Sequence, residues 1–253
     1  MLVAERRELL LSRLRAEGKL VATDLAHELG MSEDSVRRDL RELAAAGLCQ
    51  RVYGGALPLS PALVDYGARR EVEPASKQRV AARAADLIRP GDRVILDGGT
   101  TTLAVVRALP PDLAATVITH SPTIAAALVD HPTIETLLIG GRIYKHSAVA
   151  CGAVAAEAAS GVSADVFLLG VIGVHPREGL TTGDAEEAAM KRTLASRAAD
   201  TYVLASKEKI GVAGPYKVMP LDDVAGVITD ALQDDPTIVG LKRTGVTIVP
   251  AGS

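Results

Sequence analysis

The sequence predicts an α/β protein in which a small helical N-terminal module precedes a larger, mainly parallel, Rossmann-like domain. Two observations carry this prediction. Residues 1–57 show three short helical patterns followed by a short hairpin. From residue 77 to residue 253, continuous apolar runs alternate with helical patterns. Such runs are typical of strands buried on both faces of a parallel sheet.

Composition is that of an ordinary globular protein and narrows the possible partners. Hydrophobic residues make up 48% of the 253 residues, but aromatic residues only 2%, which argues against stacking platforms for single-stranded nucleic acid. The formal net charge is −3, and residues 1–57 hold nine basic and nine acidic side chains. A nucleic-acid partner must therefore be argued from local motifs, because no global basic excess indicates one.

Targeting and metal signals are missing from the sequence. The chain becomes charged at Glu5 and its apolar runs are too short to span a bilayer, so we expect a cytoplasmic protein without a membrane partner. Cys49 and Cys151 lack the spacing of metal ligands, and we expect them to be small buried apolar residues. No metal and no cofactor are predicted.

Residues 1–57 form the first predicted domain, with three helices. Leu10 and Leu14 share one face of the first helix, which ends at Gly18. Thr23 is the candidate N-cap of a second helix that ends at Gly30. The pattern predicts two short helices on either side of Gly30, as in a helix-turn-helix.

Ser32 caps the third predicted helix, in which Val36, Leu40 and Leu43 recur at helical spacing and face the core. Asp34, Ser35, Arg37, Arg38 and Arg41 remain outside the buried stripe. In a helix-turn-helix the second helix enters the major groove of DNA, where arginines reach guanine edges or phosphates. This helix is therefore the predicted recognition helix.

Residues 47–55 read as a strand, a turn and a glycine pair, which together resemble a wing. The candidate DNA contacts are Ser32, Ser35, Arg37, Arg38, Arg41, Arg51 and Tyr53. The alternative is a helical cap with solvated charges, in which the acidic residues Glu33, Asp34, Asp39 and Glu42 pair with the arginines.

Residues 58–76 contain three prolines and little apolar periodicity, so we expect a linker that packs partly on the next domain, residues 77–253. In that domain strands are predicted at 94–96, 116–119, 136–139, 166–171, 202–205, 226–228 and 246–249. Helices are predicted at 77–88, 102–109, 123–129, 153–159, 185–198 and 236–242.

The central motif of the second domain is the loop Asp97, Gly98, Gly99, Thr100, Thr101, Thr102, which joins a strand to a helix. A glycine pair allows the backbone to approach a ligand closely, and the N–H groups of a helix N-terminus favour an anion. Phosphate is therefore a natural guest. The alternative is a turn in which threonine merely caps the helix.

Other polar clusters follow neighbouring strands, where ligands bind in such folds. The further candidate effector contacts are His120, Ser121, Arg142, Tyr144, Lys145, Glu186, Lys191 and Lys209. The four cations among them could neutralise an anion held by the threonine loop. His120 could equally hydrogen-bond at a helix start, Tyr144 and Lys145 could cover the sheet edge, and Glu186 could pair with Lys191.

Over nearly its full length the chain resembles the DeoR (GlpR-like) family of bacterial transcriptional regulators. The N-terminal match runs from Met31 to Leu40 and ends in Arg51-Val52-Tyr53-Gly54-Gly55-Ala56. The C-terminal match comprises Asp97–Thr102, Gly140-Gly141, Gly152, Gly179–Thr182, Glu186 to Arg192, and Thr229-Asp230.

The resemblance implies a winged helix-turn-helix joined to a sensor domain similar to ribose-5-phosphate isomerase. It implies a repressor of a carbohydrate-metabolism operon that binds double-stranded operator DNA as a homo-oligomer, a dimer or tetramer. A phosphorylated sugar or polyol would control its operator affinity. The implied protein is no enzyme.

The chain departs from the family pattern at Ile172 and Ser206, where many members carry Asp, and at His120, where the usual Thr-Asn-Ser reads Thr119-His120-Ser121. These changes remove candidate general bases and acceptors for sugar hydroxyls. The alternative function is a sugar-phosphate isomerase or deaminase with an added DNA-binding domain. Its base would be Glu186, with Asp97 and Asp184 nearby.

Overall fold

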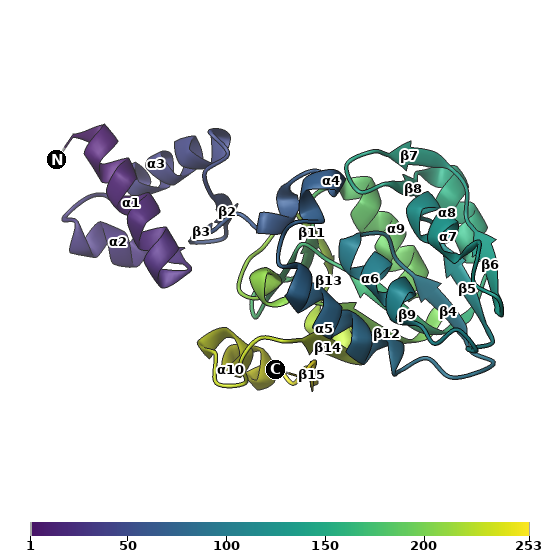
Figure 1. Ribbon diagram of the computed structural model, residues 1–253. Helices are drawn as coiled ribbons and strands as arrows, with labels where there is room; N and C mark the ends of the chain where they lie inside the picture. The colour runs from purple at the N-terminus through teal and green to yellow at the C-terminus, as the bar shows by residue number, and fades with distance from the viewer. Residues whose placement is uncertain (1, 253) are drawn as a thin grey trace.

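The computed structural model describes residues 2–252. A helical N-terminal module stands beside a larger α/β body, and one stretch of chain joins them (Figure 1). The module consists of α1 (Val3–Glu17), β1 (Leu20–Val21), α2 (Ala22–Glu28), α3 (Glu33–Ala45), β2 (Gln50–Val52) and β3 (Gly55–Leu57). Its strands pair antiparallel in the order β1-β3-β2. The predicted winged helix-turn-helix is confirmed.

Apolar side chains from all three helices form the core of this module. They include Leu10, Leu14, Leu25, Val36, Leu40 and Leu43. The prediction that Thr23 caps the second helix is wrong, because α2 starts at Ala22 and Val21 is the N-cap. Val21 belongs to β1 and pairs with Gly55 of the wing. A Cβ at Gly55 would lie 1.8 Å from the Leu20 carbonyl oxygen, so only glycine allows this close pairing.

The segment of residues 58–73, which we call the joining segment, is packed on the α/β body. It contains a 3₁₀ turn, η1 (Pro61–Leu63), and one short helix, α4 (Tyr66–Arg69). Ala62, Tyr66 and Arg69 are buried. The helix expected from Lys77 begins three residues earlier, as α5 (Pro74–Ala85), since proline is well suited to the first turn of a helix.

The α/β body is built on a seven-stranded parallel sheet with the strand order β15-β14-β12-β9-β4-β5-β6. The strands are β4 (Arg93–Leu96), β5 (Ala115–Thr119), β6 (Ile134–Leu138), β9 (Ala164–Gly170), β12 (Ala198–Leu204), β14 (Gly226–Thr229) and β15 (Ile248–Pro250). All seven predicted strands are present. The order runs outward from β4 on one side and from β9 on the other, so the carboxyl ends of β4 and β9 flank the topological switch point.

Helices cover both faces of the sheet. They are α6 (Thr100–Ala108), α7 (Pro122–Leu128), α8 (Ala153–Ser160), α9 (Ala185–Ala195) and α10 (Pro236–Arg243), together with α5. Leu96 and Leu168 pack with α5, α6 and α7, whereas Ile95 and Phe167 pack with α8, α9 and α10. Successive strand residues therefore enter opposite cores, as strands buried on both faces require.

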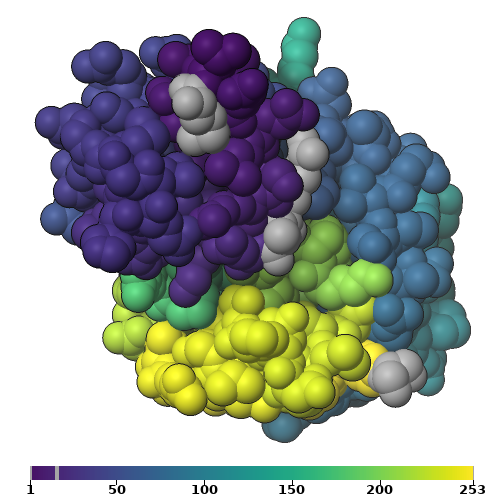
Figure 2. Space-filling model, turned by 90° about the vertical axis from the view of Figure 1, so that its left-hand side faces the viewer, coloured from purple at the N-terminus to yellow at the C-terminus, as the bar shows by residue number. Residues whose placement is uncertain are grey.

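Short antiparallel strands, which the sequence did not predict, decorate the sheet. They are β7 (Arg142–Tyr144), β8 (Val149–Cys151), β10 (Gly173–His175), β11 (Gly179–Thr182) and β13 (Tyr216–Met219). Two more 3₁₀ turns are η2 (Lys207–Lys209) and η3 (Leu221–Asp223). Figure 2 shows the N-terminal module in purple, in front of the α/β body and above the C-terminal residues in yellow. Within residues 2–252, every helix is too short or too polar to cross a bilayer.

Candidate functional site

The glycine-threonine loop lies at the switch point, between the end of β4 and the start of α6. Gly99 is the N-cap of α6 and has a φ of 124°. A Cβ at Gly98 would lie 2.1 Å from Val149 Cγ1, so this position has no room for a side chain. The loop thus takes a path that needs both glycines, and it brings Thr100, Thr101 and Thr102 to the wall of a pocket.

Asp97 is completely buried and connects four parts of the structure. Its Oδ1 accepts hydrogen bonds from the Gly98 N–H and from His120 Nε2, both at 2.8 Å. Its Oδ2 accepts from the Gly170 N–H at 2.8 Å and from Lys191 Nζ at 2.5 Å. Burial alone would raise the pKa of Asp97, but Lys191 and His120 lower it far below its ordinary value. Asp97 is therefore an ionised brace for the loop.

His120 hydrogen-bonds Asp97 and does not line the pocket itself. Its side chain is fully buried, and Nδ1 hydrogen-bonds the Ala150 carbonyl oxygen at 2.8 Å. The sequence left open whether His120 contacts a ligand or hydrogen-bonds locally. The geometry favours the local role, because both ring nitrogens already have partners.

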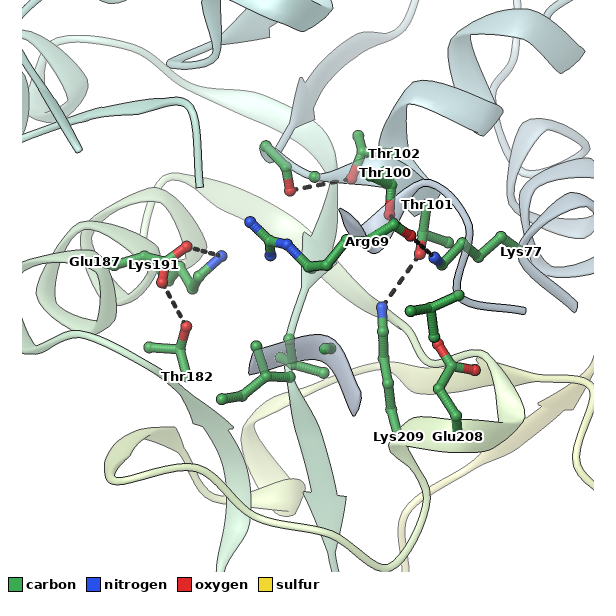
Figure 3. A pocket seen from close by; sticks show the side chains of 17 residues that line it. Arg69, Lys77, Thr100, Thr101, Thr102, Thr182, Glu187, Lys191, Glu208 and Lys209 are labelled. Atoms are coloured by element: carbon green, nitrogen blue, oxygen red, sulfur yellow. Dashed lines mark hydrogen bonds and ion pairs between the residues drawn. The ribbon is translucent and has the colours of Figure 1, made fainter. Parts of the chain in front are cut away.

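The pocket beside the loop collects side chains from distant parts of the chain (Figure 3). Its polar and charged lining consists of Arg69, Lys77, Thr100, Thr101, Thr102, Thr182, Glu187, Lys191, Glu208 and Lys209. Of the candidate effector contacts, Lys191 and Lys209 line it together with the loop, from Gly98 to Thr102.

Lys209 is the predicted cation that fits the pocket most directly. It is 5% exposed, and its Nζ lies 3.1 Å from Thr101 Oγ1 and 3.4 Å from the Leu204 carbonyl oxygen. Burial lowers the pKa of Lys209 from 10.5 to about 8. In Figure 3 its side chain rises from η2 toward the threonine loop.

Arg69 and Lys77 were missed by the sequence analysis because they fall in and just after the predicted linker. Lys77 Nζ donates a hydrogen bond to the Arg69 carbonyl oxygen. Burial lowers the pKa of both side chains. One signal could have found Lys77, since it lies on the same helical stripe as Val80, Ala81 and Ala84, which are all buried.

Among the described residues Arg69, Lys77 and Lys209 form no ion pair, whereas Lys191 has two carboxylate partners, Asp97 and Glu187. The pocket therefore holds three buried cations without an ion-pair partner. Burying such charges is costly unless an anion compensates them.

Glu187, and not the predicted Glu186, lines the pocket, as does a second acidic residue, Glu208. Glu187 is buried, lies 3.5 Å from Lys191 Nζ and accepts a hydrogen bond from Thr182 Oγ1 at 2.6 Å. Glu186 faces the other side of α9 and pairs with Arg142 in the open. The suggested Glu186–Lys191 pair is therefore wrong by one residue, because the glutamate partner of Lys191 is Glu187. The sequence of α9 did not show which of the two adjacent glutamates faces the interior.

Four further candidates lie away from the pocket lining. Arg142 and Lys145 are exposed, and the Tyr144 ring lies 5.8 Å from the ring of His146. Ser121 Oγ donates to the Ala148 carbonyl oxygen at 3.0 Å. Their roles, and that of Glu186, as effector contacts stay predictions.

The N-terminal module presents a second candidate site along α3. Ser32 caps the helix and accepts a hydrogen bond from the Ser35 N–H at 3.2 Å. The arginines of α3 point outward, with Arg37, Arg38 and Arg41 all exposed. On the wing Arg51 and Tyr53 are exposed as well.

Two of the four acidic residues of α3 pair with arginines of α1 instead of with the arginines of α3. Asp39 is buried and pairs with Arg6 of α1 at 2.5 Å, and Glu42 pairs with Arg7. Arg37 pairs with Glu33 at 2.6 Å, but within the described chain neither Arg38 nor Arg41 joins an ion pair. The cap of mutually paired charges, the alternative raised by the sequence, is therefore realised at one position only.

Comparison with known proteins identifies the family. Residues 6–61 match the DeoR-like helix-turn-helix domain, and residues 72–231 match the DeoR C terminal sensor domain. The chain is 30% identical to the HTH-type transcriptional regulator GlpR of Haloferax volcanii, over 98% of both chains. It is 31% identical to the HTH-type transcriptional repressor GlcR of Bacillus subtilis, over 97% of this chain and 95% of that one.

Among solved structures, the chain is similar to the ribose 5-phosphate isomerase A of Methanocaldococcus jannaschii. The identity is 18% and the TM-score 0.39, over 53% of this chain and 52% of that one, which is too distant to inform on function. The family models and relatives are regulators, so the alternative of an isomerase or deaminase is not retained. The chain belongs to the DeoR family of DNA-binding transcriptional regulators.

Proposed function

We propose that this regulator represses a carbohydrate-metabolism operon and that a phosphorylated sugar or polyol, bound in the pocket at the glycine-threonine loop, controls its affinity for operator DNA. The observation that carries the proposal is the group of three buried cations without ion-pair partners, Arg69, Lys77 and Lys209, around that loop. A phosphate would compensate their charge and accept hydrogen bonds from the N-terminus of α6.

The sugar side of the effector would meet carboxylates at new positions. Ile172 and Ser206 stand where many family members carry Asp, but Glu187 and Glu208 also line this pocket. Ser206 Oγ donates to Glu208 Oε1 at 2.7 Å, whereas Oε2 is buried and has no hydrogen-bond partner among the described residues. That oxygen can accept a hydrogen bond from a sugar hydroxyl. The effector would therefore combine an anionic group with at least one hydroxyl.

The DNA-binding part of the proposal rests on α3 and the wing. Exposed Arg37, Arg38 and Arg41 lie on one helix that starts at the Ser32 cap, as in a recognition helix. Ser35, Arg51 and Tyr53 would contact the same duplex. We expect a homo-oligomer, because two recognition helices can read half-sites one helical turn or a multiple apart.

A thermal-shift screen tests the effector. Hexose, pentose and polyol phosphates are compared with the same unphosphorylated sugars, since a specific ligand raises the apparent stability by mass action. We expect stabilisation by phosphorylated compounds only. Stabilisation by an unphosphorylated sugar, without any phosphorylated one, would contradict the assignment.

A DNA-binding assay tests the recognition helix. Arg37→Ala combined with Arg38→Ala should weaken binding to the upstream region of its own gene at least about 30-fold, at about 1–3 kcal/mol for each lost base contact. The matched control is Arg89→Ala with Arg107→Ala, which removes the same charge from exposed positions of the α/β body. If both pairs bind DNA equally, α3 is not the recognition helix.

A further inference from the structure

The joining segment forms part of the pocket that we assign to the effector. Ala62, Arg69 and Val72 of this segment line it opposite the glycine-threonine loop. Figure 3 shows the Arg69 guanidinium in the middle of the pocket, between Lys191 and the threonines. The only covalent connection between the DNA-binding module and the α/β body therefore passes over the candidate effector site.

Several side-chain contacts fix this segment to the α/β body, among them the Glu73–Lys207 ion pair and the hydrogen bond from Lys77 Nζ to the Arg69 carbonyl oxygen. Ser60 Oγ donates to the Ile172 carbonyl oxygen, and Tyr66 OH donates to Thr123 Oγ1 at 3.1 Å. Arg69 Nη2 donates to the His146 carbonyl oxygen at 2.6 Å and to Ser147 Oγ at 3.4 Å. These contacts hold one end of the Arg69 guanidinium and leave the other free.

The free end of Arg69 carries an unsatisfied donor. The residue is only 9% exposed, yet its Nε is buried and has no hydrogen-bond partner. Among residues 2–252, three buried side-chain polar atoms have no partner, and two of them, Arg69 Nε and Glu208 Oε2, belong to residues that line this pocket. A donor and an acceptor left unpaired in one pocket together point to a ligand that would satisfy both.

We propose that Arg69 binds the anionic group of the effector and that this contact fixes the joining segment, so that occupancy of the pocket is transmitted to the DNA-binding module. This inference rests on the proposed function, to which it adds the residue and segment that couple the two sites. An effector that contacts both Arg69 and the threonine loop binds more tightly to the arrangement in which the segment is closed over the pocket. It can therefore shift the equilibrium between DNA-competent and DNA-incompetent arrangements.

The test uses inorganic phosphate, full-length protein and hydrogen exchange followed by mass spectrometry, with sodium chloride at matched ionic strength as reference. Phosphate should stabilise the wild type against heat and slow amide exchange in residues 58–73. Arg69→Met should raise the dissociation constant for phosphate about 10- to 100-fold, the worth of a hydrogen bond to a charged group, and abolish the protection. Arg70→Met is the matched control, since Arg70 is the next residue in the chain and its side chain is exposed.

The outcomes separate this inference from the proposed function. If phosphate binds Arg69→Met as tightly as the wild type, the role of Arg69 is refuted and the phosphate site stands. If phosphate binds the wild type without slowing exchange in residues 58–73, the coupling is refuted. If it does not bind the wild type, both proposals fail. If Arg69→Met does not fold, Arg69→Lys replaces it in the test, because lysine keeps the charge but lacks Nε. Arg69→Lys should bind phosphate at least about tenfold more weakly than the wild type does.

Discussion

Replacing Lys209 with methionine should stabilise the ligand-free protein and at the same time abolish its response to phosphate. The ammonium group is buried, forms no ion pair within the described chain and has only the Thr101 hydroxyl and the Leu204 carbonyl oxygen as partners. Methionine has a similar length and no charge to bury. Function and stability should therefore oppose each other at this position.

The structure gives the size of the effect. Burial lowers the pKa of Lys209 from 10.5 to about 8, which corresponds to about 3 kcal/mol against the charged form, at about 1.4 kcal/mol per pKa unit. The pKa shift already contains what the two hydrogen bonds add to the charged form, so methionine removes that penalty and loses only what they give the neutral amine, about 0.5 kcal/mol for each of these long bonds. The expected net gain is about 2 kcal/mol, or an increase in Tm of about 4–8 °C for a chain of this size.

Differential scanning calorimetry with and without inorganic phosphate measures both halves of the prediction. Lys207→Met is the matched control, because Lys207 lies two residues away, is exposed and pairs with Glu73 at the surface. Its Tm should change little, and its phosphate response should persist. A Lys209→Met protein that melts below the wild type, or that phosphate still stabilises normally, would refute the reasoning.

Three further predictions follow from buried groups. Asp97→Asn should lower the free energy of unfolding by about 3–5 kcal/mol at neutral pH, because it leaves Lys191 without its main partner. The pKa of Asp97 is lowered in the folded protein, so the carboxylate stabilises the fold above pH about 4 and ceases to do so as the pH falls below it. The free energy of unfolding of the variant, measured by urea denaturation, should therefore depend less on acid pH than that of the wild type. Phosphate affinity should fall as the pH rises above about 8, where Lys209 loses its proton, and calorimetric titration of the wild type and of the Lys207→Met control over this pH range should show the same fall. Burial raises the pKa of Cys151 to about 12 and also that of Cys49, so a thiol reagent should label neither in the native protein and both after unfolding, and rapid native labelling would contradict their burial.

The regular part of the fold was predictable because its signals are long and periodic. Seven apolar runs became the seven strands of one parallel sheet, and Val36, Leu40 and Leu43 became the core face of α3. The short antiparallel strands were not predicted, since a segment of three or four residues is too short to show the alternation of apolar and polar side chains that is typical of a strand. Thr23 was wrongly predicted as the N-cap of α2, because the start of this helix is set by β1. That strand forms only by pairing with the wing, which is distant in the sequence.

The candidate site was predictable where its residues share the glycine-threonine loop or belong to polar clusters that follow a predicted strand. The sequence located Asp97 to Thr102, Lys191 and Lys209, which line or brace the pocket. It missed Arg69 and Glu208, because nothing in a linker or a 3₁₀ turn tells which side chains the tertiary fold will bury. It also missed Lys77, although the buried stripe of its helix could have indicated it. It also chose Glu186 over Glu187, a difference of one residue that turns the carboxylate from the pocket to the solvent.

The brace at Asp97 has a consequence for how such sensors diversify. One carboxylate ties the loop, Gly170, His120 and Lys191 together without facing outward for chemistry. If the pocket binds an effector as proposed, this frame is separate from Ile172 and Glu208, the lining residues that would contact the rest of the molecule. Substitutions at these two positions would then change which metabolite fits while the frame keeps its shape. A sensor built in this way can change its signal without rebuilding the fold that reports it.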